Sequence, residues 1–151
     1  MTEARSEEPC LYTIGYEGRR IGDFLATLLA LRVKTIVDVR DSASSRKLGF
    51  SSGMLARLAG RIGIAYHHLP GLGVPSQYRE EFHSLSTVRA ARQAYCRRVK
   101  AEAESSLAEA ELICRSGNVV LVCYERDARY CHRYALSGLL SEITGLEVYH
   151  L

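Results

Sequence analysis

The sequence predicts an α/β fold: a single Rossmann-like, doubly wound, mainly parallel five-stranded sheet with helices on both faces. Short β-branched runs alternate along the chain with stretches whose apolar residues recur at helical spacing. Such alternation requires crossover connections, which are right-handed and place helices on the faces of a parallel sheet. The length of 151 residues is that of one such domain.

The individual elements follow from apolar runs and turn residues. Strands are predicted at 10–15, 35–40, 62–67, 118–124 and 146–150. Helical patterns follow around 24–31, 51–58 and 130–143, and residues 76–116 are helix-rich with breaks near 85–86 and 105–106. We expect the strand order 3-2-1-4-5, in which winding reverses between the first and fourth strands. Ligands usually bind at that point, beyond the carboxyl ends of the strands.

Composition restricts the class of protein. The chain is 47% hydrophobic and 25% charged, as in ordinary globular proteins. Residues 1–9 are polar and unlike a secretory signal, which predicts a disordered tail before a single domain at 10–151. No apolar run approaches the roughly 20 residues of a membrane span. Five cysteines at irregular spacing favour free thiols and a cytoplasmic protein. The net charge of +3 suits a phosphate-bearing ligand.

Polar residues that hydrophobic patterning does not explain follow four of the predicted strands. Because parallel strands end at one edge of the sheet, we expect these side chains to share one crevice. Those with acid–base groups are assigned to catalysis: Glu17, Asp38, His68, Glu125 and His132. Those suited to holding a ligand are assigned to binding: Tyr16, Arg40, Ser45, Arg46, Cys131 and Arg133. None of them is assigned to a metal.

Two of these assignments leave a structural alternative open. Asp38 and Arg40 alternate along a strand and share a face, so they either serve the site or form a structural ion pair. His67 and His68 face opposite ways, so at most one enters the crevice, and we favour His68. A lone histidine is more often structural than catalytic, but the glycine-rich turn that follows allows close backbone approach to a ligand and leaves both roles open. Arg40 and Arg46 together suit an anion.

Residues 123–133, with the sequence CYERDARYCHR, allow three kinds of chemistry. Cys123 and Arg129 have the Cys-x5-Arg spacing of cysteine phosphatases, an arrangement that would also suit a rhodanese-like sulfur carrier. Against this, the loop lacks the glycines of phosphate-cradling loops. A zinc site could instead combine Cys123, Cys131 and His132 with His68, although the spacing is not a paired Cys-x-x-Cys.

The third interpretation is the one we prefer. Glu125 acts as a general base, while Cys131, His132 and Arg133, in the first turn of the last helix, bind an anion or orient the acid–base pair.

The chain resembles the family known as domain of unknown function 488. The resemblance is carried by TIGYEGR at 13–19, VDVR at 37–40, LVCYE at 121–125 and CHR at 131–133. It implies a Rossmann-like fold and a shared polar site, and it supplies no activity or cofactor. Ala128 stands where the family usually has proline, and Arg129 is variable in the family, which weakens the phosphatase interpretation.

From these residues we expect an enzyme acting on a phosphate-bearing substrate, such as a nucleotide or nucleic acid. The alternatives are a non-catalytic nucleotide or nucleic-acid binding module, using the basic residues within 89–100, and a small zinc-stabilised interaction domain. No cofactor or oligomeric state is predicted.

Overall fold

The computed structural model describes residues 8–151, so all but the last two residues of the tail expected at 1–9 lie outside the described residues. Its centre is a five-stranded sheet in which every pairing is parallel. The α/β, doubly wound fold class predicted from the sequence is confirmed. The strands are β1 (Leu11–Gly15), β2 (Thr35–Asp38), β3 (Ala65–His68), β4 (Val119–Cys123) and β5 (Val148–His150).

The strand order is β3-β2-β4-β1-β5, so the predicted order 3-2-1-4-5 was wrong in the placement of the first and fourth strands. The two strands are neighbours in both arrangements, but β4 lies between β2 and β1. All five residues of β4 are buried, whereas Tyr12 in β1 is only partly buried. The most apolar strand takes the central position because it is covered on both faces and paired on both edges.

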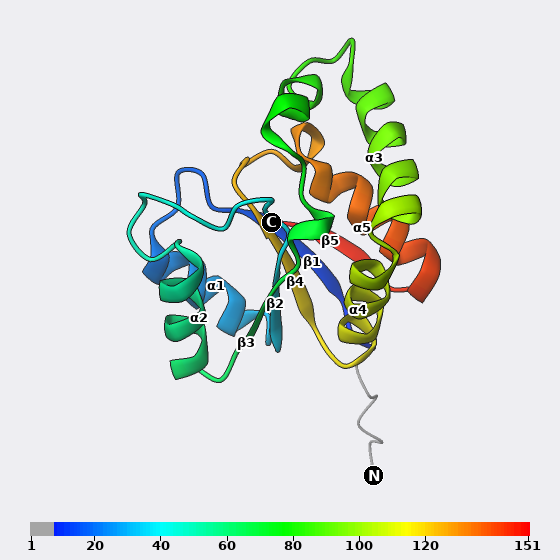
Figure 1. Ribbon diagram of the computed structural model, residues 1–151. Helices are drawn as coiled ribbons and strands as arrows, with labels where there is room; N and C mark the ends of the chain where they lie inside the picture. Colours follow the sequence, from blue (N-terminus) through cyan, green and yellow to red (C-terminus); the bar gives the residue numbers. More distant parts are fainter. Residues whose placement is uncertain (1–7) are drawn as a thin grey trace.

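Helices cover the two faces of the sheet as separate groups (Figure 1). On one face, α1 (Ile21–Ala30) and α2 (Ser52–Arg61) pack Phe24 and Leu55 against the sheet. The other face carries α3 (Val88–Glu102), α4 (Glu104–Arg115) and α5 (His132–Thr144). Within residues 8–151, three 3-10 helices complete the fold: η1 (Pro70–Leu72), η2 (Ser76–Phe82) and η3 (Ala128–Tyr130).

In this arrangement the direction in which the chain winds across the sheet reverses, and ligand sites of such sheets lie at the reversal. The connections that leave β1 and β2 carry α1 and α2 on one face, whereas the connections into and out of β4 carry α3, α4 and α5 on the other. The chain therefore diverges above the carboxyl ends of β1, β2 and β4, and a crevice opens there.

Helix boundaries differ from the sequence prediction in two places. The break between α3 and α4 falls at Ala103, just before the expected pair of serines. The last helix begins at His132, because residues 128–130 form the separate 3-10 turn η3. Gly145 ends α5 in the left-handed conformation, with φ of 77°, as its C-cap position predicts. Among residues 8–151, no helix is both long and apolar enough to span a bilayer.

Candidate functional site

A cavity of about 160 Å³ lies at the carboxyl edge of the sheet, where β1, β2 and β4 end. Its wall combines residues that follow each of these strands with the start of α5, and η2 closes it from the side. The residues that concern the chemistry are Tyr16, Arg40, Ser42, Ser44, Arg79, Phe82, Cys123, Glu125, Cys131 and His132.

Gly15, the last residue of β1, allows the loop after β4 to cross close above it. A Cβ atom at this position would lie 1.7 Å from the carbonyl oxygen of Glu125. The adjacent backbone is tied down by hydrogen bonds from Tyr16 N to Cys123 O at 3.1 Å and from Glu17 N to Tyr124 O at 2.9 Å. The absence of a side chain at Gly15 therefore allows the backbone of Glu125 to lie close to the end of β1, at its position in the cavity wall.

Arg40 and Asp38 form a buried bidentate ion pair beneath the cavity. Arg40 Nε donates to Asp38 Oδ1 at 2.8 Å, and Nη2 donates to Oδ2 at 2.6 Å. Arg40 Nη1 donates to Tyr16 Oη and to the carbonyl oxygen of Phe50. Burial opposes charge on Arg40, but the hydrogen bonds and charge of Asp38 outweigh it and raise its pKa. The guanidinium of Arg40 is thus largely committed to neighbours within the protein.

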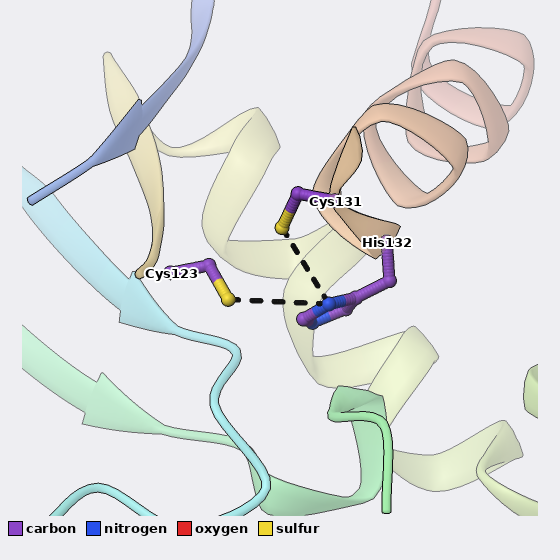
Figure 2. A group of neighbouring side chains, drawn as sticks. All are labelled: Cys123, Cys131 and His132. Atoms are coloured by element: carbon purple, nitrogen blue, oxygen red, sulfur yellow. Dashed lines mark hydrogen bonds between the residues drawn. The ribbon is translucent and has the colours of Figure 1, made fainter. Parts of the chain in front are cut away.

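Two buried thiols and one imidazole meet at the start of α5. His132 Nδ1 lies 3.6 Å from Cys131 Sγ and 3.9 Å from Cys123 Sγ. Figure 2 shows both sulfur atoms turned toward the imidazole, with Cys123 reaching from the end of β4. On the other side of the ring, Nε2 lies 2.8 Å from the carbonyl oxygen of Val39. A carbonyl can only accept, so Nε2 carries a proton and Nδ1 faces the sulfurs.

The two thiols have opposite pKa shifts. Burial works against charge on Cys131, but the hydrogen bond from Cys123 and the nearby His132 lower its pKa well below the ordinary value. The same hydrogen bond, together with burial, raises the pKa of Cys123. Burial also opposes charge on His132, yet the negative charge of Cys131 raises the pKa of the imidazole. The cluster therefore favours a thiolate on Cys131 beside an imidazolium.

Glu125 is the carboxylate of the cavity wall and is 21% exposed. Its Oε2 lies 3.5 Å from Cys123 Sγ, and its Oε1 lies 3.5 Å from His83 Nε2. Burial, followed by the charge of Cys131, raises the pKa of Glu125. A carboxylate held in this way suits proton transfer to or from a molecule in the cavity.

The residues proposed from sequence divide into two groups. Tyr16, Arg40, Glu125, Cys131 and His132 lie in the cavity wall. The wall does not include the other six: Glu17, Asp38, Ser45, Arg46, His68 and Arg133.

Most residues of the second group have contacts that suggest supporting roles. Glu17 accepts a hydrogen bond from Arg126 N at 2.9 Å, and His68 Nε2 lies 2.7 Å from Arg40 O. Ser45 caps its own turn through Lys47 N, whereas Arg46 is exposed.

Arg133 is fully buried and holds the loop after β4 from below. It donates from Nη1 to Glu125 O at 2.5 Å and from Nη2 to Arg126 O at 3.1 Å, while Nε contacts Thr13 Oγ1 at 3.3 Å. These acceptors occupy all three guanidinium nitrogens, which favours a positioning role for Arg133 over direct binding of an anion.

Several wall residues could not be identified from the sequence. Arg79 and Phe82 belong to η2 and line the cavity. The sequence of this segment predicts only helix, and it contains no signal that the segment lies beside the end of a strand. Ser42 and Ser44 lie in the serine-rich loop after β2, where only Ser45 was assigned to a ligand. Cys123 was considered as a nucleophile and as a zinc ligand, and the structure places it beside Cys131.

All five cysteines are free thiols in the structure. Comparison with known proteins matched the model of one family, Domain of unknown function DUF488, to residues 20–140. Neither the curated proteins nor the solved structures gave a significant match.

Proposed function

Because the chain belongs to the family Domain of unknown function DUF488, whose description assigns no activity, we propose a function from the cavity: an enzyme acting on a small phosphate-bearing substrate such as a nucleotide. One observation carries this proposal. Acid–base and thiol side chains from the exit of β4 and the start of α5 line one cavity together with residues from the exits of β1 and β2, at the reversal point of the sheet.

Glu125 is the general base or acid in this proposal. Its carboxylate is in the cavity wall, partly exposed, and close to His83 and Cys123. His132 lies beside the two thiols, and its bond to Val39 O holds the ring in one orientation. Fixed geometry matters because a proton acceptor works only within hydrogen-bond reach of the proton that it removes.

Arg79 is the residue best placed to attract a phosphate. It is exposed and lines the cavity, and Nε donates to Val74 O at 3.2 Å. Within residues 8–151, its two terminal nitrogens have no acceptor. Ser42 and Ser44 lie in the same wall. Their hydroxyls are hydrogen-bonded to each other at 3.0 Å, which leaves one hydroxyl proton as a further donor. A planar guanidinium with free donors binds phosphate oxygens in pairs.

The volume of the cavity limits what it can enclose. At about 160 Å³ it is smaller than the roughly 300 Å³ at which sites for whole drug-sized ligands begin. It accommodates a phosphoryl group and the atoms next to it, and the rest of a nucleotide would lie outside the mouth beside Arg79. Mononucleotides and phosphorylated ends of oligonucleotides are the substrates that fit this description.

The test compares phosphorylated and unphosphorylated forms of the same compounds. Binding of a nucleoside and its 5′-monophosphate is measured by thermal shift and ligand-detected NMR, and turnover is followed by mass spectrometry. Arg79→Gln should weaken binding of the monophosphate about tenfold or more and leave the nucleoside unchanged, since it removes a charged hydrogen-bond donor. Arg97→Gln, an exposed arginine on α3, is the matched control.

Glu125→Gln should abolish turnover while binding of the monophosphate persists. Equal binding of nucleosides and monophosphates, or unchanged turnover in Glu125→Gln, would contradict the proposal.

Non-catalytic nucleic-acid binding through α3 is the competing interpretation. It predicts a salt-dependent gel shift that is unchanged when Glu125 is substituted. Two of the α3 arginines are already engaged within the protein, since Arg92 donates to Arg129 O and Arg98 to Gly73 O.

A further inference from the structure

Cys123, Cys131 and His132 form a group of donor atoms that resembles a metal site. One atom from each residue, Sγ from the cysteines and Nδ1 from the histidine, lies within 4.8 Å of the other two. All three residues are buried, with exposed fractions of 6%, 2% and 6%. They come from the end of β4 and the start of α5, so the fold itself brings them together (Figure 2).

The two separations from Nδ1 to the sulfurs are close to those of tetrahedral coordination, and the sulfurs lie within 4.8 Å of each other. Bond lengths of about 2.3 Å to sulfur and about 2.0 Å to nitrogen place the two kinds of donor about 3.5 Å apart, and two sulfurs about 3.8 Å apart. The observed distances from Nδ1 are 3.6 Å to Cys131 Sγ and 3.9 Å to Cys123 Sγ. An ion can therefore enter with small side-chain movements.

The histidine is oriented as metal-binding histidines are. Its Nε2 proton is donated to Val39 O at 2.8 Å, so Nδ1 is the ring atom directed toward the sulfurs, and its lone pair can bind an ion once the imidazolium has lost the Nδ1 proton. A carbonyl acceptor on the far ring nitrogen is the usual partner that fixes the tautomer of a ligating imidazole. His68, the other histidine considered from sequence, is bound to Arg40 O and is not part of the group.

We propose that Cys123, Cys131 and His132 bind one zinc ion, or another thiophilic divalent ion, with a fourth coordination position facing the cavity. Two thiolates and one imidazole are soft donors that select zinc over magnesium or calcium. Binding releases two protons to solvent, one from the Cys123 thiol and one from the pair formed by Cys131 and His132, and the charges of the two thiolates and the ion cancel.

The fourth position connects this ion to the cavity. All three ligands line the cavity, as does Glu125, whose Oε2 lies 3.5 Å from Cys123 Sγ. Glu125 is outside the group of mutually close donor atoms, so it suits a neighbouring base better than a fourth ligand. Three protein ligands with one open position are typical of catalytic zinc, and a water bound there could pass its proton to Glu125. Metal binding does not depend on the proposed substrate.

The first experiment measures metal in the full-length protein. Purified protein is stripped with a chelator, loaded with Zn²⁺, dialysed, and analysed by mass spectrometry of the elements. One equivalent per chain is expected. Loading with Co²⁺ should produce an intense near-ultraviolet thiolate-to-cobalt band and the visible bands of tetrahedral cobalt, which report cysteine ligation directly in the wild-type protein.

The second experiment assigns the ligands. A variant with Cys10→Ser, Cys96→Ser and Cys114→Ala keeps only the two cysteines of the group and should retain the full cobalt spectrum. Cys123→Ser, Cys131→Ser and His132→Gln should each weaken Zn²⁺ binding at least a hundredfold. If these single variants fail to fold, the triple variant still assigns the band to Cys123 and Cys131.

Each outcome bears on one proposal only. No bound metal, metal without the thiolate band, or a spectrum lost in the triple variant would overturn the metal site. Glu125→Gln should keep the metal and lose turnover. If zinc binds and no phosphorylated substrate is turned over, the proposed function fails and the metal site stands. If turnover proceeds in metal-free protein, the metal site loses its part in the reaction.

Discussion

His132 Nε2 lies 2.8 Å from the carbonyl oxygen of Val39, so the first turn of α5 is bonded to the backbone at the exit of β2. The bond joins residues 93 positions apart in sequence. It fixes His132, a residue of the cavity wall, to the segment that follows β2. It also determines which ring nitrogen faces the sulfurs of Cys123 and Cys131.

The first prediction concerns the proton of this bond. His132 should carry hydrogen on Nε2 with or without zinc, and that proton should exchange slowly because the residue is buried. Long-range ¹H–¹⁵N correlation spectra of labelled protein identify the tautomer. His67, whose side chain is 46% exposed, is the internal control and should exchange rapidly. A zinc-free His132 whose Nε2 carries no hydrogen would contradict the assignment.

Breaking the buried ion pair of Asp38 and Arg40 should lower the free energy of unfolding. Asp38→Asn leaves Arg40 buried without its counter-charge, and we expect a loss of about 3–5 kcal/mol in the free energy of unfolding. Arg40→Lys should also destabilise, since an ammonium cannot replace the bidentate contact. Urea denaturation measures both. Glu111→Gln, in an exposed pair with Arg115, is the control and should cost less than about 1 kcal/mol.

Gly15→Ala tests the close crossing of the loop after β4. The added Cβ atom would meet Glu125 O, and relief of the overlap should destabilise the protein by about 1–3 kcal/mol and displace Glu125. Gly138→Ala is the matched control, because this exposed helical glycine has nothing within 4 Å of the new atom. Alanine should stabilise α5 there by up to about 1 kcal/mol. Equal stability of the two variants would refute the steric argument.

Asp127 should titrate well below an ordinary aspartate. Its side-chain and backbone hydrogen bonds with Arg129 lower its pKa from 3.8 to about 2. Because the folded pKa is depressed, the contact stabilises the protein above pH 3.8, and this contribution is lost as pH falls toward 2. The effect on stability is small, since both side chains are exposed. NMR titration of the carboxyl carbon measures the pKa, and Arg129→Ala should return it toward 3.8.

The sequence by itself determined the fold class and the location of the candidate site. Alternation of apolar strands with amphipathic helices leaves parallel pairing as the solution, and parallel pairing brings every strand exit to one edge. Arg40, which lies far from Glu125 and His132 in the chain, could therefore be predicted to approach them, and all three line the cavity.

Tertiary structure alone decided the strand order and the role of each polar residue. Local periodicity records which face of an element is buried, but the position of β4 between β2 and β1 depends on competition among strands for the centre of the sheet. Likewise, an arginine beside a strand exit has the same sequence pattern whether its guanidinium faces a ligand or the protein. Arg133 donates to backbone carbonyls and Arg79 lines the cavity, because non-local packing determines which acceptors each can reach.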